Sequence, residues 1–174
     1  MQDGDSALLR RDMSSTMQAE CPPSSGALPD QLVTDAASRQ ISPVNSNCFV
    51  CGRRNATGLH LMFEGGSQGV EAIWIPNDSS ESFQNTVRGG LITSVLDEAM
   101  SKAIMANGWQ AFTVCISVRF HSRISPGERL RAHGWTVERR KRRILTEASL
   151  VTDSGIERAH ARATFLMPSG SQVR

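Results

Sequence analysis

The stretch at residues 86–100, "TVRGGLITSVLDEAM", determines how the rest of the chain is interpreted. A pair of glycines, Gly89 and Gly90, opens a strongly apolar run whose helical period continues for about five turns. The apolar stripe is too wide for a helix that rests on a surface, so we expect one long and largely buried helix. Two adjacent acids, Asp97 and Glu98, interrupt the run. They form either a solvated polar strip or part of an active site.

Strand-like runs surround the expected helix. Two runs precede it and are separated by a glycine-rich turn, and four runs follow it, the first of which alternates with a period of two. They lie at residues 58–65, 70–77, 112–122, 129–138, 143–153 and 157–167. Because no second long helix is present in this pattern, a parallel doubly wound sheet is excluded. The pattern predicts an α+β fold, with an antiparallel sheet of about five to six strands around one helix.

The composition limits the class of protein. The net charge of +2 is too small to indicate a nucleic-acid partner. No run of about 18 apolar residues is present, so we expect no membrane span. Residues 1–45 are rich in Ser, Pro, Asp, Gln and Ala, and we expect a disordered leader there, a domain at 46–168 and a flexible tail at 169–174. The leader resembles neither a secretory signal nor a mitochondrial presequence, which predicts a cytoplasmic protein.

A C-x-x-C pair, Cys48 and Cys51, is the only metal-like motif in the sequence. A structural zinc site needs four ligands, and usually a second such pair. His60 is a possible third ligand, but the sequence offers no good fourth. We therefore expect two reduced thiols in a turn, with no metal ion and no cofactor.

Four pieces of the sequence, in this order, resemble the hotdog-fold thioesterases, and most closely the phenylacetate-type (PaaI) acyl-CoA thioesterases. The pieces are NCFVCGRRNATGLHLMF at 47–63, RGGLITSVLDEAM at 88–100, TVCISVRF with SPGE at 113–128, and LVTDSGIERAHARATF at 150–165. The resemblance runs from about residue 47 to residue 167. It implies a long helix wrapped by an antiparallel sheet, active sites at a dimer interface, and a coenzyme A thioester as substrate. The family usually has His directly before the two glycines, where this chain has Arg88.

Hydrolysis of a thioester develops negative charge on the carbonyl oxygen. Free backbone N–H groups at a helix N-terminus stabilise such an oxyanion, and Gly89 and Gly90 stand at that start. Alternatively, these glycines only permit a sharp turn and close packing. Asp97 is the candidate base or nucleophile. Asp97 follows Gly90 by seven residues, which places the two about 10 Å apart along the helix axis. One carbonyl group cannot contact both of them on the same helix, so the two can act together only if they come from different subunits. This spacing predicts a homodimer or a dimer of dimers.

The resemblance assigns roles to further residues. Thr113 matches a Ser or Thr whose hydroxyl orients the water, although a β-branched residue also suits a strand without any function. Asn85 matches an Asn that holds the thioester or the water in some members. Arg88 either donates to the thioester or the pantetheine arm, or has a structural role; being always charged, it cannot act as a base. Glu98 is expected to be a structural neighbour of Asp97.

Five cations at residues 139–143 stand at an expected hairpin tip. Coenzyme A carries a 3′-phosphate and a pyrophosphate, so Arg140, Lys141 and Arg142 are candidates to bind them. A solvated turn explains the same run equally well. A nucleic-acid patch is disfavoured because aromatic interleaving and a second patch are missing.

We expect from these patterns an enzyme that hydrolyses an acyl-CoA. Two alternatives stay open: a protein that binds acyl thioesters without cleaving them, and a biosynthetic enzyme that acts on a carrier-protein thioester.

Overall fold

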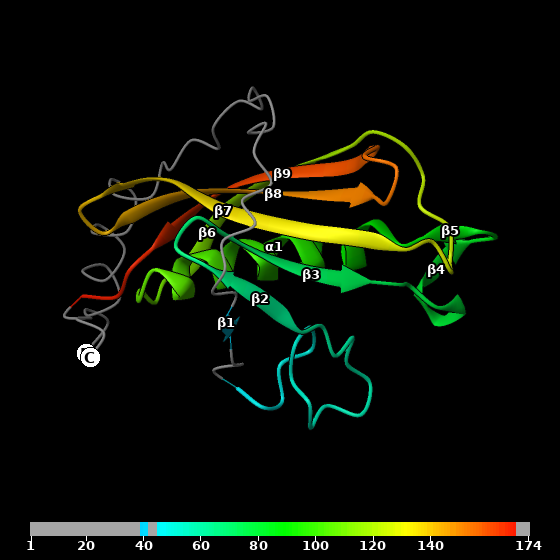
Figure 1. Ribbon diagram of the computed structural model, residues 1–174, viewed down its shortest axis with the longest axis horizontal. Helices are drawn as coiled ribbons and strands as arrows, with labels where there is room; N and C mark the ends of the chain where they lie inside the picture. The colour runs from blue at the N-terminus through cyan, green and yellow to red at the C-terminus, as the bar shows by residue number, and fades with distance from the viewer. Residues whose placement is uncertain (1–38, 42–44, 170–174) are drawn as a thin grey trace, which may run out of the picture.

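The computed structural model describes residues 39–41 and 45–169. One long helix packs against one face of a seven-stranded antiparallel sheet, as Figure 1 shows. The strands of this sheet are β1 (Arg39–Ile41), β2 (Phe63–Gly66), β3 (Gly69–Trp74), β6 (Phe112–Phe120), β7 (Leu130–Arg140), β8 (Arg143–Thr152) and β9 (Glu157–Leu166). The 3-10 helix η1 (Asp78–Ser80), the hairpin of β4 (Glu81–Phe83) and β5 (Thr86–Val87), and the helix α1 (Gly89–Ala106) lie between β3 and β6.

The sheet order places β6 at an edge. The order is β1-β2-β3-β7-β8-β9-β6, so the chain leaves β3, passes through α1 and returns at the far edge. Strands β7, β8 and β9 then fill the gap between β3 and β6 through consecutive hairpins. The helix thereby runs across one face of the whole sheet (Figure 1). This arrangement confirms the α+β hotdog architecture that the sequence indicated.

The long helix starts at the glycine pair and has the predicted length of about five turns. It begins at Gly89 and ends at Ala106, and Gly108 follows with a left-handed φ of 76°. The N–H of Gly108 donates to the Met105 carbonyl at 2.9 Å, and the N–H of Trp109 donates to the Ile104 carbonyl at 3.2 Å. This pair of bonds is a Schellman motif, which uses the conformational freedom of glycine to end a helix.

The helix packs directly on the backbone of β7. A Cβ atom added to Gly134 would overlap the backbone carbonyl of Ala99 on α1. Both residues are buried, and Ala132 beside them on β7 is fully buried too. Small side chains on both elements therefore let helix and sheet approach closely, which fixes the position of α1 and of the residues it carries.

The sheet has more strands than the five to six predicted. The additional strand β1 falls in the stretch expected to be a leader, and it pairs with β2. The first predicted strand is shortened to β2, because the N–H groups of Leu59 and Leu61 donate to the carbonyls of Phe49 and Val50 in the cysteine loop. Residues 1–38, 42–44 and 170–174, which include most of the predicted leader and tail, lie outside the described residues. Within the described part of the chain, no helix has the length and apolar character to cross a membrane.

Candidate functional site

The start of α1 presents two free backbone donors. The N–H groups of Leu91 and Ile92 both donate to the carbonyl of Arg88, at 3.0 and 3.2 Å. Among the described residues, the N–H groups of Gly89 and Gly90 have no hydrogen-bond acceptor. With the positive end of the helix dipole behind them, these two groups are suited to bind an anionic oxygen.

Gly90 is not required by the fold of this chain. A Cβ atom at Gly90 would meet nothing within 4 Å, and its φ lies outside the left-handed region. A Cβ atom at Gly89 would make an ordinary contact, at 3.4 Å, with the ring of Phe120. Neither a turn nor packing within one chain therefore explains the glycine at position 90, whereas close approach of a ligand to the backbone would.

Asp97 and Thr113 are brought together by the packing of α1 on β6. The hydroxyl of Thr113 donates to Asp97 Oδ1 at 2.7 Å. Asp97 is half-buried, and this burial raises the pKa of its carboxyl above the usual range. The hydrogen bond from Thr113 lowers the pKa, and the negative charge of Glu98 raises it, but burial has the largest effect. A carboxylate with a raised pKa and a fixed orientation is suited to accept a proton from water.

The two parts of the site do not meet within one chain. Seven residues of helix separate Gly90 from Asp97, a rise of about 10 Å. The hydroxyls of Thr93 and Ser94, which lie between them, donate at 2.9 Å to the carbonyls of Gly89 and Gly90. These bonds satisfy both hydroxyls within the helix, so the Asp97 carboxylate is a better candidate for proton transfer than either of them.

The other residues predicted near the helix start have local partners. The side chain of Arg88 is exposed and makes no capping bond, while its N–H donates to the Ser80 carbonyl at 2.8 Å. Asn85 occupies the turn between β4 and β5 with a φ of 55°, a conformation that Asn tolerates. Its N–H donates to Glu81 Oε1 at 2.8 Å, and its carbonyl accepts from the Ser125 hydroxyl at 3.2 Å. This turn explains Asn85 without a catalytic role.

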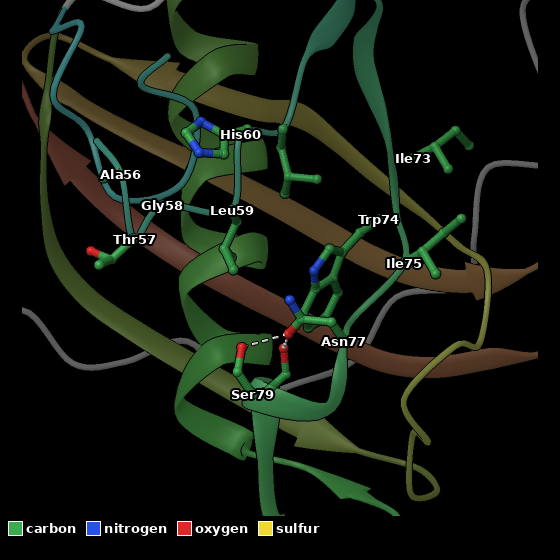
Figure 2. Close-up of a pocket in the computed structure, with 12 residues that line it drawn as sticks. Ala56, Thr57, Gly58, Leu59, His60, Ile73, Trp74, Ile75, Asn77 and Ser79 are labelled. Carbon is green, nitrogen blue, oxygen red and sulfur yellow. Dashed lines mark hydrogen bonds between the residues drawn. The ribbon is translucent and has the colours of Figure 1, made fainter. Parts of the chain in front are cut away.

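A groove of about 520 Å³ lies beside the start of α1 and was not anticipated from the sequence. Its walls are residues 56–61, 73–75, 77, 79 and 80. Figure 2 shows Leu59 on one side and Ile75 on the other, with Asn77 accepting hydrogen bonds from two serine hydroxyls at 2.7 and 3.1 Å. The carbonyl of one of them, Ser80, binds the N–H of Arg88. The outward isoleucines of the run VEAIWIPN were the only sequence signal for this groove.

The basic residues lie at the opposite end of the helix. Arg140, Lys141 and Arg142 form the tip of the β7–β8 hairpin, which extends past the C-terminal end of α1 (Figure 1). The guanidinium of Arg139 stacks at 4.7 Å over the ring of Trp109, just beyond the helix. Arg140 pairs at 2.6 Å with a glutamate of its own strand, and Arg142 donates at 2.8 Å to a carbonyl that follows β9. Within one chain, this tip is remote from the glycine pair.

A second cluster joins the cysteine loop to α1. Cys48 Sγ lies 3.7 Å from Glu98 Oε2, and Lys102 Nζ, on a side chain that is 1% exposed, lies 3.6 Å from Glu98 Oε1. Burial raises the pKa of Cys51 to about 12, helped by a hydrogen bond to Glu98. His60 instead approaches the Gly52 carbonyl through Nδ1, at 3.1 Å. This arrangement was not predicted from the sequence, where only the C-x-x-C motif and the i,i+4 spacing of Glu98 and Lys102 pointed to it.

Comparison with known proteins shows the fold, and a family to which part of the chain is similar. Residues 84–159 match the family model of the thioesterase superfamily. No curated protein matches the chain. The solved thioesterase superfamily protein RHA08564 superposes with a TM-score of 0.68 and 23% identity, covering 75% of this chain and 67% of its own.

Two further structures carry more specific descriptions. The Escherichia coli PaaI protein from the phenylacetic acid degradation operon has a TM-score of 0.60 and 16% identity, covering 65% of this chain and 83% of its own. A Streptococcus mutans protein bound to acetyl CoA has a TM-score of 0.58 and 18% identity, with coverages of 61% and 86%. At these identities the structures show a shared fold. Together with the family model over residues 84–159, they confirm the resemblance that the motifs indicated: this chain carries the hotdog fold, and that part of it is similar to the thioesterase superfamily.

Proposed function

We propose that this protein hydrolyses an acyl-CoA, or a related acyl thioester, to the free acid and the thiol. The observation that carries the proposal is the 2.7 Å hydrogen bond between Thr113 and Asp97, which orients a half-buried carboxylate of raised pKa. The free N–H groups of Gly89 and Gly90 supply the second element that hydrolysis needs, a site for the developing oxyanion.

In the proposed reaction, the thioester carbonyl oxygen accepts hydrogen bonds from the N–H groups of Gly89 and Gly90. Asp97 of the partner subunit removes a proton from a water molecule, whose oxygen attacks the carbonyl carbon. The tetrahedral intermediate then collapses with cleavage of the C–S bond, and the departing thiolate takes up a proton. Asp97 could instead attack directly and form an acyl anhydride that water cleaves. Thr113 orients the carboxylate in either route, and no cofactor is required.

A dimer is part of this proposal. Strand β6 forms one edge of the sheet, and such an edge can pair with a second copy. Its exposed residues include Phe112 and Val114, which are 71% and 39% exposed. Burial of this apolar edge against a second copy would bring two α1 helices side by side and antiparallel. Gly90 of one subunit could then face Asp97 of the other.

The same geometry gives the basic hairpin a role. In this dimer, Gly90 faces Asp97 of the partner subunit, and the partner's helix continues for nine more residues. Its end at Ala106 therefore lies about 13 Å beyond Gly90 along the helix axis. We expect the coenzyme A arm to leave the site in this direction. The partner's hairpin tip with Arg140, Lys141 and Arg142 would follow there and bind the phosphates. The Streptococcus mutans relative bound to acetyl CoA supports a ligand of this class.

Arg88 favours a second candidate function, binding of acyl thioesters without cleavage. Its guanidinium is exposed at the helix start, where it can donate to a thioester or a phosphate but cannot accept a proton. Action on a carrier-protein thioester is a variant of the first proposal. A cytoplasmic location and the lack of a nucleic-acid partner stay predictions.

The test is thiol release from a panel of acyl-CoAs by the wild type, Asp97→Asn and Glu64→Gln. Loss of the base should lower kcat/KM about 10²- to 10⁴-fold in Asp97→Asn. Glu64→Gln makes the same acid-to-amide change at an exposed position of β2 and should keep full activity. Turnover that survives in Asp97→Asn would contradict the assigned base. A wild type that binds acyl-CoA but releases no thiol would favour the binding function.

A further inference from the structure

The cysteine loop and α1 bring three metal-ligating side chains together. The Sγ atoms of Cys48 and Cys51 and a carboxylate oxygen of Glu98 all lie within 4.8 Å of one another. Atoms bound to one zinc ion lie about 2.0–2.3 Å from it, and hence about 3.5–3.8 Å from each other in a tetrahedral site. The 3.7 Å between Cys48 Sγ and Glu98 Oε2 already has this spacing. An ion requires only small rotations of these side chains.

The loop that carries the cysteines is held by its own backbone. The N–H of Gly52 donates to the Cys48 carbonyl at 2.9 Å, and the N–H of Arg54 donates to the Ser46 carbonyl at 2.8 Å. A Cβ atom at Gly52 would overlap the backbone of Cys48, so the loop closes tightly only with glycine there. The two thiols are therefore presented on a preorganised turn, which lowers the cost of binding a ligand.

The third donor is oriented by a buried cation. Lys102 lies 3.6 Å from Glu98 Oε1, which leaves Oε2 directed at the thiols. Partners of this kind, beyond the ligands themselves, fix ligand orientation in metal sites. The charges also balance: two thiolates and a carboxylate bring three negative charges, and a divalent ion with Lys102 brings three positive ones. Zero net charge keeps the desolvation cost of this partly buried site low.

We propose that Cys48, Cys51 and Glu98 bind a divalent transition metal ion of the zinc class, with a solvent molecule as the fourth ligand. Thiolate ligands select zinc over magnesium or calcium. We expected no metal because the sequence near the cysteines offers too few ligands. The fold adds the carboxylate of Glu98, which follows Cys48 by 50 residues in the sequence and lies beside it in the structure. The proposed hydrolysis takes no step through this ion, and metal binding and thiol release are measured independently, so each proposal can fail without the other.

The test uses the full chain, reduced with a phosphine and stripped of metal by a chelator. Co²⁺ is added while the thiolate-to-cobalt charge-transfer absorption is recorded, and Zn²⁺ is then used to displace it. The variants are Cys48→Ser, which keeps a hydroxyl donor for Glu98, and Glu98→Gln. The matched control is His60→Asn, a change in the same part of the chain that suits the positive φ of 53° there. Circular dichroism checks that each variant is folded.

We expect the wild type and His60→Asn to bind one ion per chain with a sulfur charge-transfer band. Cys48→Ser and Glu98→Gln should bind about tenfold more weakly or worse. The assignment is overturned if the reduced wild type shows no band, if the band persists in Cys48→Ser, or if His60→Asn abolishes it. Unchanged affinity in Glu98→Gln would overturn the role of the carboxylate, and Cys51→Ser provides a second check should Cys48→Ser fail to fold.

Discussion

Replacement of Gly90 by alanine separates the two explanations of the glycine pair. Within the chain, the added methyl group meets no atom within 4 Å, so it should fit without strain. Alanine is a better helix former than glycine by up to about 1 kcal/mol, so the free energy of unfolding should stay the same or rise. If Gly90 made no contact with a ligand, Gly90→Ala would therefore be harmless to both stability and activity.

The proposed oxyanion site predicts a different result for activity. A Cα–Cβ bond in a helix tilts toward the N-terminus, so the methyl group of Gly90→Ala projects into the space that the free N–H groups face. Loss of one oxyanion donor costs about 10²- to 10³-fold in kcat, and obstruction of both should cost at least about 10²-fold in kcat/KM. At about 1.36 kcal/mol for each factor of ten, this is about 2.7 kcal/mol of transition-state stabilisation.

Thiol release and thermal denaturation of Gly90→Ala, measured side by side, check both statements. A variant as stable as the wild type but about 10²-fold slower supports the oxyanion site. A stable variant with full activity would refute the contact between substrate and this N–H group. A strongly destabilised variant would refute the open space around Gly90, and would point to a second subunit packed there.

Three further changes test the site and the fold. Thr113→Val removes the hydroxyl that orients Asp97 and should lower kcat/KM about tenfold, measured by thiol release, while Thr113→Ser should restore most of it. Gly134→Ala forces a methyl group against the Ala99 carbonyl and should cost about 1–3 kcal/mol in urea unfolding. Burial lowers the pKa of His133, so stability should fall as the pH drops below about 6.5, and His133→Gln should flatten that decline in urea titrations at different pH.

The change at Gly134 has a matched control. Gly66→Ala adds the same methyl group where nothing lies within 4 Å, so it should unfold like the wild type. An equal loss in Gly66→Ala and Gly134→Ala would argue against the close contact of α1 with β7. For His133, the sign follows from its depressed pKa: the folded protein excludes a proton that the unfolded chain accepts at low pH. A His133→Gln variant with unchanged pH dependence would place the acid sensitivity elsewhere.

Local pattern predicted much of the fold. The bounds of α1 follow from the glycine pair, the apolar period and Gly108, all of which act through bonds between near neighbours. The hairpins at the C-terminal end were predicted for the same reason, since alternation and turn residues are local. The shortening of β2 could not be predicted, because Leu59 and Leu61 take partners in the cysteine loop in place of a strand.

For the candidate site, the sequence identified the candidate residues and how far apart they stand on the helix. The spacing of Gly90 and Asp97 is fixed by the rise of any α-helix, whatever surrounds it. The tertiary structure decided their environment: the bond from Thr113 on β6 to Asp97, the raised pKa of Asp97, and the open space at Gly90. It also decided that Glu98 meets two thiols and a buried lysine. How deeply a side chain is buried and which side chains it contacts depend on segments far apart in the sequence, so both are decided by tertiary packing.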